Sequence, residues 1–178
     1  MKRTVAREIA VHMVFAMGFG GRDAEETIAH HLTKEQFACF VPDEVQEALE
    51  EEFTEERTSI YLEFPDKKQE EYIRSVVTGV YEHFAELDSY ISKYAIGWSF
   101  HRIPRVTAAI MRVAMYEILY RSDIPNGAAI NDAVELSKSY EDEELTKFIN
   151  GILGSFVRGE QIPEKGIQEI DDADDTGV

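Results

Sequence analysis

The sequence predicts an all-α protein. Apolar side chains recur every three or four residues in several segments, as they do on one face of a helix. Clusters rich in glycine or proline, at residues 18–21 and 122–127, separate these segments, and no segment shows the alternating pattern of a strand. With 178 residues, 44% of them apolar, the chain can bury a substantial core, and we expect two small helical subdomains.

The N-terminal lobe is predicted to span residues 1–95. Its first helix covers residues 3–18, where six residues share one stripe: Ala6, Ile9, Ala10, Met13, Ala16 and Met17. A second helix is predicted at 23–39, before Pro42, and a longer third helix at 69–95. Between them lies a glutamate-rich insertion, residues 41–68, which we interpret as a solvated helix and a loop broken at Pro65.

The C-terminal lobe is predicted to span residues 96–158. A connector at 97–104 is expected to place Trp98 in the core, and Pro104 opens a helix at 105–121. Pro125 and Gly127 end that helix, and another follows at 129–140.

The last helix and the tail complete the domain, which covers residues 1–158. Residues 141–144, EDEE, are either a charged turn or the acidic first turn of the last helix, where the helix dipole favours carboxylates. Residues 159–178 contain little to bury and are predicted to be a disordered acidic tail.

The segment KFINGILGSF, residues 147–156, has two faces. Its apolar residues form one broad face, whereas Lys147, Asn150, Gly151 and Gly154 form an almost bare stripe on the opposite side. Glycine within a helix costs about 1 kcal/mol relative to alanine, so the stripe requires a reason. Either a neighbouring helix crosses closely at these small residues, or a ligand approaches the backbone.

The net charge of −17 is distributed unevenly. Residues 41–75 carry 12 acidic and 4 basic side chains, and residues 141–178 carry 11 and 3. The remaining residues are almost neutral, so the overall charge does not exclude a partner that is a nucleic acid.

Signatures of enzymes, metal sites and membrane spans are absent from the sequence. It contains no glycine-rich phosphate loop, no GxSxG and no HExxH, and its histidines lack the spacing of metal ligands, so we expect a protein that is not an enzyme, without metal or cofactor. A single cysteine, Cys39, is typical of a reducing compartment. No apolar stretch approaches the length of a membrane span and the N-terminus lacks a cleavage site, which predicts a cytoplasmic protein that does not contact membranes.

Two groups of basic residues are candidates for a phosphate backbone. Lys2, Arg3 and Arg7 crowd the start of the first helix, where positive charge opposes the helix dipole unless an anion binds nearby. The alternative is an ordinary exposed terminus screened by solvent. Arg102, Arg105 and Arg112 form the second group, and Arg112 has the alternative role of pairing with a carboxylate such as Glu117.

Four motifs in the C-terminal half occur in order over about forty residues. They are MRVAMYE at 111–117, DIP at 123–125, INDAVEL at 130–136 and KFING at 147–151. This series closely resembles the NusB family of transcription antitermination factors. The resemblance extends more weakly to Arg7, Glu8, Ala10 and Val11 and to Gly97 and Trp98.

The resemblance implies a helical protein of two lobes that is not an enzyme. Members of this family pair with the ribosomal protein NusE, and the heterodimer binds single-stranded boxA RNA in nascent ribosomal transcripts. This binding helps to load an antitermination complex onto RNA polymerase. A homodimer is a further alternative.

The resemblance also implies site residues. Six residues are the candidates for binding boxA-like RNA, with phosphates contacted by the cations and a base by the ring: Lys2, Arg3, Arg7, Arg105, Lys147 and Phe148. Five residues are the candidates for the surface that binds NusE: Thr107, Arg112, Glu144, Asn150 and Gly151.

The chain departs from the family pattern in ways that reduce its positive charge. Thr4 and Val5 stand where arginines are common, and Asn126–Gly127 replaces a common Tyr–Lys pair. Because fewer phosphates can then be neutralised, RNA binding is expected to depend strongly on NusE. Two alternatives stay open: a protein-only adaptor that has lost RNA contact, and a NusB-like domain linked to ribosomal RNA methylation.

Overall fold

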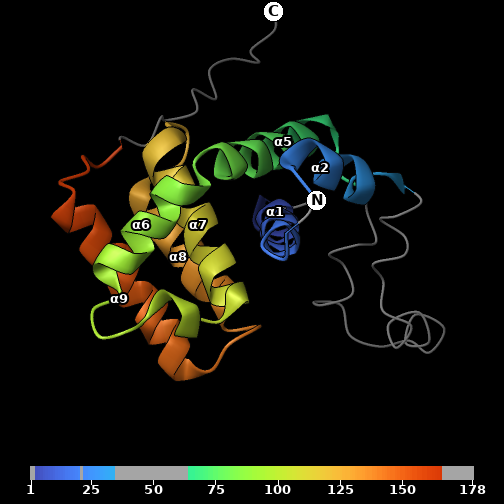
Figure 1. Ribbon diagram of the computed structural model, residues 1–178. Coiled ribbons are helices and arrows are strands. Elements are labelled where there is room, and N and C mark those ends of the chain that lie inside the picture. The colour runs from blue at the N-terminus through green and yellow to red at the C-terminus, as the bar shows by residue number, and fades with distance from the viewer. Residues whose placement is uncertain (1–2, 21, 35–63, 166–178) are drawn as a thin grey trace, which may run out of the picture.

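The computed structural model describes residues 3–20, 22–34 and 64–165 (Figure 1). Within these ranges it contains seven α-helices, one short 3-10 helix and no strand, which confirms the all-α prediction. Most of the predicted acidic insertion and the end of the tail lie outside the described residues.

The helices α1 (Arg3–Met17), α2 (Ala24–His31) and α5 (Lys67–Glu82) pack on one another and form one side of the molecule (Figure 1). α1 ends at the predicted glycine cluster. α2 begins at Asp23, whose side chain accepts a hydrogen bond from the Glu26 amide at 2.8 Å. It ends eight residues before the predicted end, and residues 35–39 lie outside the described part of the chain.

The single helix predicted at 69–95 is in fact two helices, α5 and α6 (Phe84–Tyr94), divided at His83. A capping box between Asp66 and Gln69 starts α5 two residues earlier than expected. The apolar face of α5 packs on α1, α2 and α7, whereas α6 directs Leu87 and Ile91 toward α7 and α9. The bend at His83 therefore lets one apolar pattern meet two different surfaces, and it groups α6 with the C-terminal helices.

The central element is α7 (Arg105–Tyr120), which begins directly after Pro104, as predicted. It contacts α1, α5, α6, α8 and α9, and each of its residues from 107 to 118 is buried. A helix that is buried on all sides must satisfy its polar side chains internally. This requirement explains the ion pairs described below.

The last two helices, α8 (Asn126–Ser137) and α9 (Glu143–Gly159), pack on each other and on α7. α8 begins three residues earlier than predicted, because Pro125 can precede the first helical turn without losing a hydrogen bond. In α9 the Asp142 side chain caps the Leu145 amide at 2.9 Å, and Glu143 and Glu144 occupy the first turn. Residues 143–144 thus belong to the helix and not to a charged turn.

One close approach fixes how α5 crosses α7. The Tyr116 ring lies directly against Gly79, so that a Cβ atom at Gly79 would be only 2.1 Å from Tyr116 Cζ. Gly79 and Tyr116 are both buried. At this position the crossing of the two helices requires glycine.

Trp98 does not fill the core, so that prediction is wrong. It is 39% exposed and precedes the 3-10 helix η2 (Phe100–Arg102). Ile103 of the connector is buried instead, as is Ala95, which directly follows α6.

The first residues of the predicted acidic tail pack back onto the helices. Glu160 accepts hydrogen bonds from Lys93 and Tyr94, and Ile162 joins the edge of the core. The Asn126 side chain donates to the Pro163 carbonyl at 3.0 Å. Residues 160–165 therefore pack with the helical domain.

Candidate functional site

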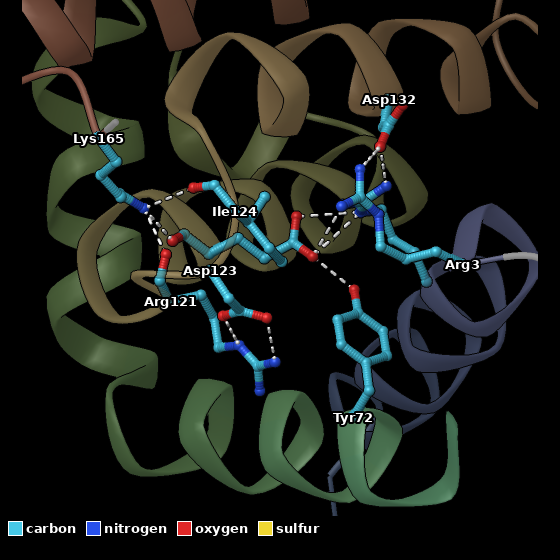
Figure 2. A network of polar contacts seen from close by, with 9 residues as sticks. Arg3, Tyr72, Arg121, Asp123, Ile124, Asp132 and Lys165 are labelled. Carbon is cyan, nitrogen blue, oxygen red and sulfur yellow. Dashed lines mark hydrogen bonds and ion pairs between the residues drawn. The ribbon is translucent and has the colours of Figure 1, made fainter. Parts of the chain in front are cut away.

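Arg7 lies inside the protein, in a polar network that joins α1 to α7 and α8 (Figure 2). Its guanidinium donates to both carboxylate oxygens of Glu117, with Nε to Oε2 at 2.9 Å and Nη2 to Oε1 at 3.0 Å, and also contacts Asp132. Tyr72 donates to Glu117 from α5. Arg7 is 2% exposed and Glu117 is fully buried.

The charges of Arg7 and Glu117 are buried and balance one another inside the fold. Burial alone would lower the pKa of Arg7, but Glu117, Tyr72 and Asp132 raise it overall. Burial and Glu117 raise the pKa of Tyr72. We expected Arg7 to contact RNA phosphate. Its guanidinium instead donates to Glu117 and Asp132 inside the fold, where a phosphate does not reach it. The sequence does not reveal that the buried partner of Arg7 lies on a helix 110 residues later.

Arg3, one turn before Arg7, is on the surface. Its side chain is 51% exposed, and its Nη2 lies 3.5 Å from Asp132 Oδ2. Asp132 therefore contacts both arginines and orients the outer one loosely (Figure 2). Lys2 lies outside the described residues.

The bare stripe of α9 faces open space. Lys147 is 74% exposed and forms an exposed ion pair with Glu143 at 2.6 Å. Asn150 and Gly151 are exposed, and a Cβ atom at Gly151 would meet nothing within 4 Å. At Gly154 the nearest contact is Arg158 of the same helix, at 3.2 Å. Within the described residues, no second helix explains these glycines, so the close-crossing interpretation is not supported.

Phe148 lies at the edge of this stripe, half-buried against the core. Its ring packs against the exposed Trp98, with 5.0 Å between ring centroids and 48° between ring planes. Arg3 and this aromatic pair are separate: no contact connects them within the described residues.

Of the predicted partner residues, Thr107 and Arg112 are buried and Glu144 is exposed. The Thr107 hydroxyl donates to Glu141 at 2.5 Å. Arg112 donates to Asp88 at 2.6 and 3.1 Å, and its guanidinium lies 4.1 Å from the centre of the Phe84 ring. The carboxylate that pairs with Arg112 is thus Asp88, not Glu117, and this pair links α6 to α7.

An apolar groove beside these residues was not predicted. It has a volume of about 630 Å³ and is formed mainly by α1, with single residues from α2, α7 and the connecting segments. Its lining residues are Ile9, His12, Met13, Phe15, Ala16, Phe19, Arg22, His31, Val106 and Tyr140. Arg105 is exposed at its end, with its guanidinium 4.4 Å from the centre of the Phe19 ring. In the sequence, these α1 residues are indistinguishable from core residues, because only the packing of the other helices shows which of them the described part of the chain leaves uncovered.

His12 occupies one wall of the groove. Its Nε2 atom lies 2.7 Å from the Tyr140 hydroxyl, which also donates to Glu8. Burial lowers the pKa of His12 to about 4, so the ring is neutral at pH 7.

Neither a metal site nor a membrane span is found in the part of the chain that the structure describes. No group of three or more histidine, cysteine, aspartate or glutamate side chains there could hold a metal ion. None of the described helices is both long and apolar enough to cross a bilayer.

Comparison with known proteins gives a consistent result. The family model described as the NusB family matches residues 4–158. The transcription antitermination protein NusB of Symbiobacterium thermophilum is 36% identical over 159 residues, which are 89% of this chain and 91% of that protein. The protein of the same name from Bacillus subtilis is 40% identical over 155 residues, which are 87% of this chain and 94% of that protein.

Solved structures share the fold. A structure of NusB from T. maritima has a TM-score of 0.63 and 27% identity, and the match covers 92% of this chain and 94% of that one. A chain in a crystal structure of the antitermination factors NusB and NusE in complex with dsRNA also has a TM-score of 0.63. It is 24% identical, with 88% and 96% of the two chains covered.

Proposed function

We propose, from the premise that this chain belongs to the NusB family of transcription antitermination factors, that it binds single-stranded boxA-like RNA as a heterodimer with the ribosomal protein NusE. The observation that carries the proposal is the family match over residues 4–158, which includes every described helix except the ends of the first and the last. In this role the protein supports transcription of ribosomal RNA in the cytoplasm, as part of an antitermination complex on RNA polymerase. The proposal includes no catalytic step.

The RNA surface in this proposal consists of the exposed cations. Arg3 on α1, Arg105 at the start of α7 and Lys147 on α9 have side chains in solvent, so phosphates can reach them. Lys2 adds to Arg3. Arg7 acts indirectly, because its ion pair with Glu117 holds α1 against α7 and so orients the helix that carries Arg3.

The NusE surface in this proposal is the apolar groove together with its rim. Monomeric proteins rarely leave a large apolar hollow without a function. Val106 lines the groove and precedes Thr107, one of the residues that the family resemblance assigns to the partner surface. Thr107 and Arg112 are buried and would support this surface from within, and Glu144, Asn150 and Gly151 are exposed on α9.

The test is a titration of fluorescent boxA-like RNA with the protein alone, with NusE alone and with both, at several salt concentrations. We expect weak binding by the single protein, because few cations face solvent, and tighter binding by the heterodimer. The logarithm of the association constant should fall linearly with the logarithm of the salt concentration. Absence of RNA binding by the heterodimer at low salt would reject the RNA role.

The protein-only adaptor is the second candidate, and one observation favours it. Arg7, one of the few cations near the N-terminus, is buried, in a chain whose net charge is −17. An adaptor forms a stable complex with NusE, but the complex binds RNA no more tightly than NusE does alone. The same titration separates the two candidates.

A further inference from the structure

Asp132 on α8 lies between two arginines of α1 that differ in exposure (Figure 2). It accepts contacts from Nη1 of Arg7 and from Nη2 of Arg3, and both contacts use its Oδ2 atom. The Arg7 side chain is 3% exposed, whereas that of Arg3 is 51% exposed and that of Asp132 is 16% exposed. One carboxylate therefore joins a buried cation to a cation that solvent reaches.

The buried cation already has a counter-ion. Glu117 accepts hydrogen bonds from Nε and Nη2 of Arg7, at 2.9 and 3.0 Å, and the two charges balance each other. Asp132 receives only the remaining Nη1 of Arg7. The negative charge of Asp132 is therefore left to balance Arg3.

The contact between Asp132 and Arg3 uses the nitrogen that a phosphate needs. A guanidinium binds a phosphate or a carboxylate at two points along one of two edges, Nε with Nη2 or Nη1 with Nη2. Arg7 shows the first of these edges in its contact with Glu117. In Arg3 the atom that faces Asp132 is Nη2, which belongs to both edges. A phosphate that binds Arg3 at two points must therefore take Nη2 from Asp132.

The contact is weak enough to be exchanged. Its length is 3.5 Å, and exposed ion pairs of this kind contribute little free energy. Arg3 forms no other ion pair or hydrogen bond within the described residues. A second carboxylate, Asp123, is engaged elsewhere, because Arg121 donates to both of its oxygens at 2.8 Å. Asp132 is therefore the carboxylate that a ligand of Arg3 has to replace.

We propose that Asp132 is an internal competitor of RNA: it holds Nη2 of Arg3 in the free protein, and a phosphate of the bound RNA displaces it. The inference rests on the proposed function, since the ligand is RNA. It assigns to Asp132, which belongs to the motif INDAVEL at 130–136, the role of lowering RNA affinity. It also gives a reason for dependence on NusE, because an RNA that a partner already holds competes better for Arg3.

The first experiment removes the charge of Asp132. Asp132→Asn retains an oxygen that can accept a hydrogen bond from Arg7, but it no longer attracts Arg3. The complex with NusE is titrated into fluorescent single-stranded boxA-like RNA at low salt, and the anisotropy is measured. We expect Asp132→Asn to bind this RNA about 2- to 5-fold more tightly than the wild type. Asp132→Glu, which keeps the charge, should bind it as the wild type does.

The gain should require Arg3. In an Arg3→Ala background, Asp132→Asn should change RNA affinity by less than about 1.5-fold, since the competing contact no longer exists. Glu135→Gln is the matched control, because Glu135 lies one turn later on α8 and pairs with Lys138. Any change that it causes should be the same with and without Arg3. An equal gain from Asp132→Asn in both backgrounds would show a general effect of charge and would overturn the competitor role.

A second measurement uses the wild-type side chains, so it does not depend on the folding of a variant complex. The aspartate carboxyl groups are labelled with carbon-13, and the Asp132 resonance is identified by its absence in Asp132→Glu. As RNA saturates the complex with NusE, this resonance should shift, because the Arg3 guanidinium leaves the carboxylate. The Asp88 resonance, from the ion pair with Arg112, serves as the reference that should not shift. An Asp132 resonance that keeps its position would contradict the displacement.

Failure of this inference differs from failure of the proposed function. If the wild-type complex binds RNA and Asp132→Asn binds it no more tightly, the competitor role is overturned and the proposed function stands. If the wild-type complex binds no RNA at low salt but Asp132→Asn does so through Arg3, the inference holds and the wild-type chain is an adaptor. If neither binds RNA, both fail. A circular dichroism melt of each variant verifies that the proteins compared are folded.

Discussion

Arg7 and Glu117, 110 residues apart in the sequence, form a buried two-point ion pair that joins α1 to the central helix α7 (Figure 2). Both side chains are almost fully excluded from solvent. A pair of this kind adds less to stability than an apolar pair of similar size, but losing one member leaves an uncompensated charge in the core. The arginine that the sequence suggests for RNA is thus a determinant of the fold.

The first prediction concerns this ion pair. Arg7→Met should lower the free energy of unfolding by about 3–5 kcal/mol, because Glu117 would remain buried without its cation. The double variant Arg7→Met/Glu117→Leu should recover part of that loss, since no buried charge remains at either position. Urea denaturation followed by circular dichroism measures both. A change below 1 kcal/mol in Arg7→Met would contradict the structural role.

The second prediction separates Arg3 from Arg7. Arg3→Ala should leave unfolding unchanged within about 0.5 kcal/mol, because its contact with Asp132 is long and exposed. It should reduce the salt slope of RNA binding by the NusE complex by about one unit. Arg74→Ala is the matched control, since Arg74 on α5 is a cation of similar exposure: its side chain is 48% exposed, and that of Arg3 is 51% exposed. Equal effects of the two substitutions would show that Arg3 has no specific role.

The third prediction compares two glycines in helices. Gly79→Ala should destabilise the protein by about 1–3 kcal/mol, because the new methyl group would overlap the Tyr116 ring. Gly151→Ala should stabilise it by up to about 1 kcal/mol, since its surroundings are open and alanine favours the helix. Thermal unfolding of both variants provides the measurement. Stabilisation by Gly79→Ala would show that α5 and α7 can separate without cost.

The sequence predicts the helical class and most helix positions, because amphipathic patterns and caps are local. It does not predict the division at His83, since the apolar pattern continues through it and only the packing of α6 on α7 and α9 shows the bend. It places Trp98 in the core, because hydrophobicity alone does not show that the turn at Gly97 directs the ring outward.

The candidate site was predictable where its residues are adjacent in sequence, and not where it depends on pairs that are distant. Lys147, Asn150 and Gly151 share a helical face, and the structure leaves all three exposed. The partners of Arg7 and Arg112 are carboxylates on other helices, and no local pattern indicates which carboxylate each one meets. The apolar groove is likewise a property of helices that do not quite cover α1.

The fourth prediction is a pH dependence from His12. Burial lowers its pKa from the usual 6.5 to about 4, so the folded protein holds the ring neutral where the unfolded chain would already bind a proton. The stability from this residue is fully present above pH 6.5 and is lost as the pH falls from 6.5 through 4, by at most about 3 kcal/mol. His12→Gln should show a smaller loss over that interval. Identical pH profiles of unfolding for the two proteins would refute the assignment.

The fifth prediction concerns Lys165, the last described residue. Its ammonium donates to three backbone carbonyls at the end of α7, those of Glu117 and Arg121 at 2.7 Å and that of Ile124 at 3.0 Å (Figure 2). The Glu117 carbonyl lies in the last turn of α7, at the negative end of the helix dipole, where it also accepts a hydrogen bond from the Arg121 amide. The Arg121 and Ile124 carbonyls belong to the turn that follows the helix. Burial lowers the pKa of Lys165, because the ammonium loses part of its hydration.

Because the Glu117 carbonyl belongs to the same residue that binds Arg7, Lys165 stabilises the turn of α7 on which the α1 contact depends. Lys165→Met should therefore lower the free energy of unfolding by about 1.5–3 kcal/mol, the usual contribution of hydrogen bonds to a charged group. Deletion of residues 166–178 is the matched control, which retains Lys165 and should leave stability unchanged, whereas deletion of residues 160–178 should cost at least as much as Lys165→Met. Urea denaturation of the three variants measures whether residues 160–165 stabilise the fold. Equal free energies of unfolding for all three would mean that the contacts of these residues contribute nothing to stability.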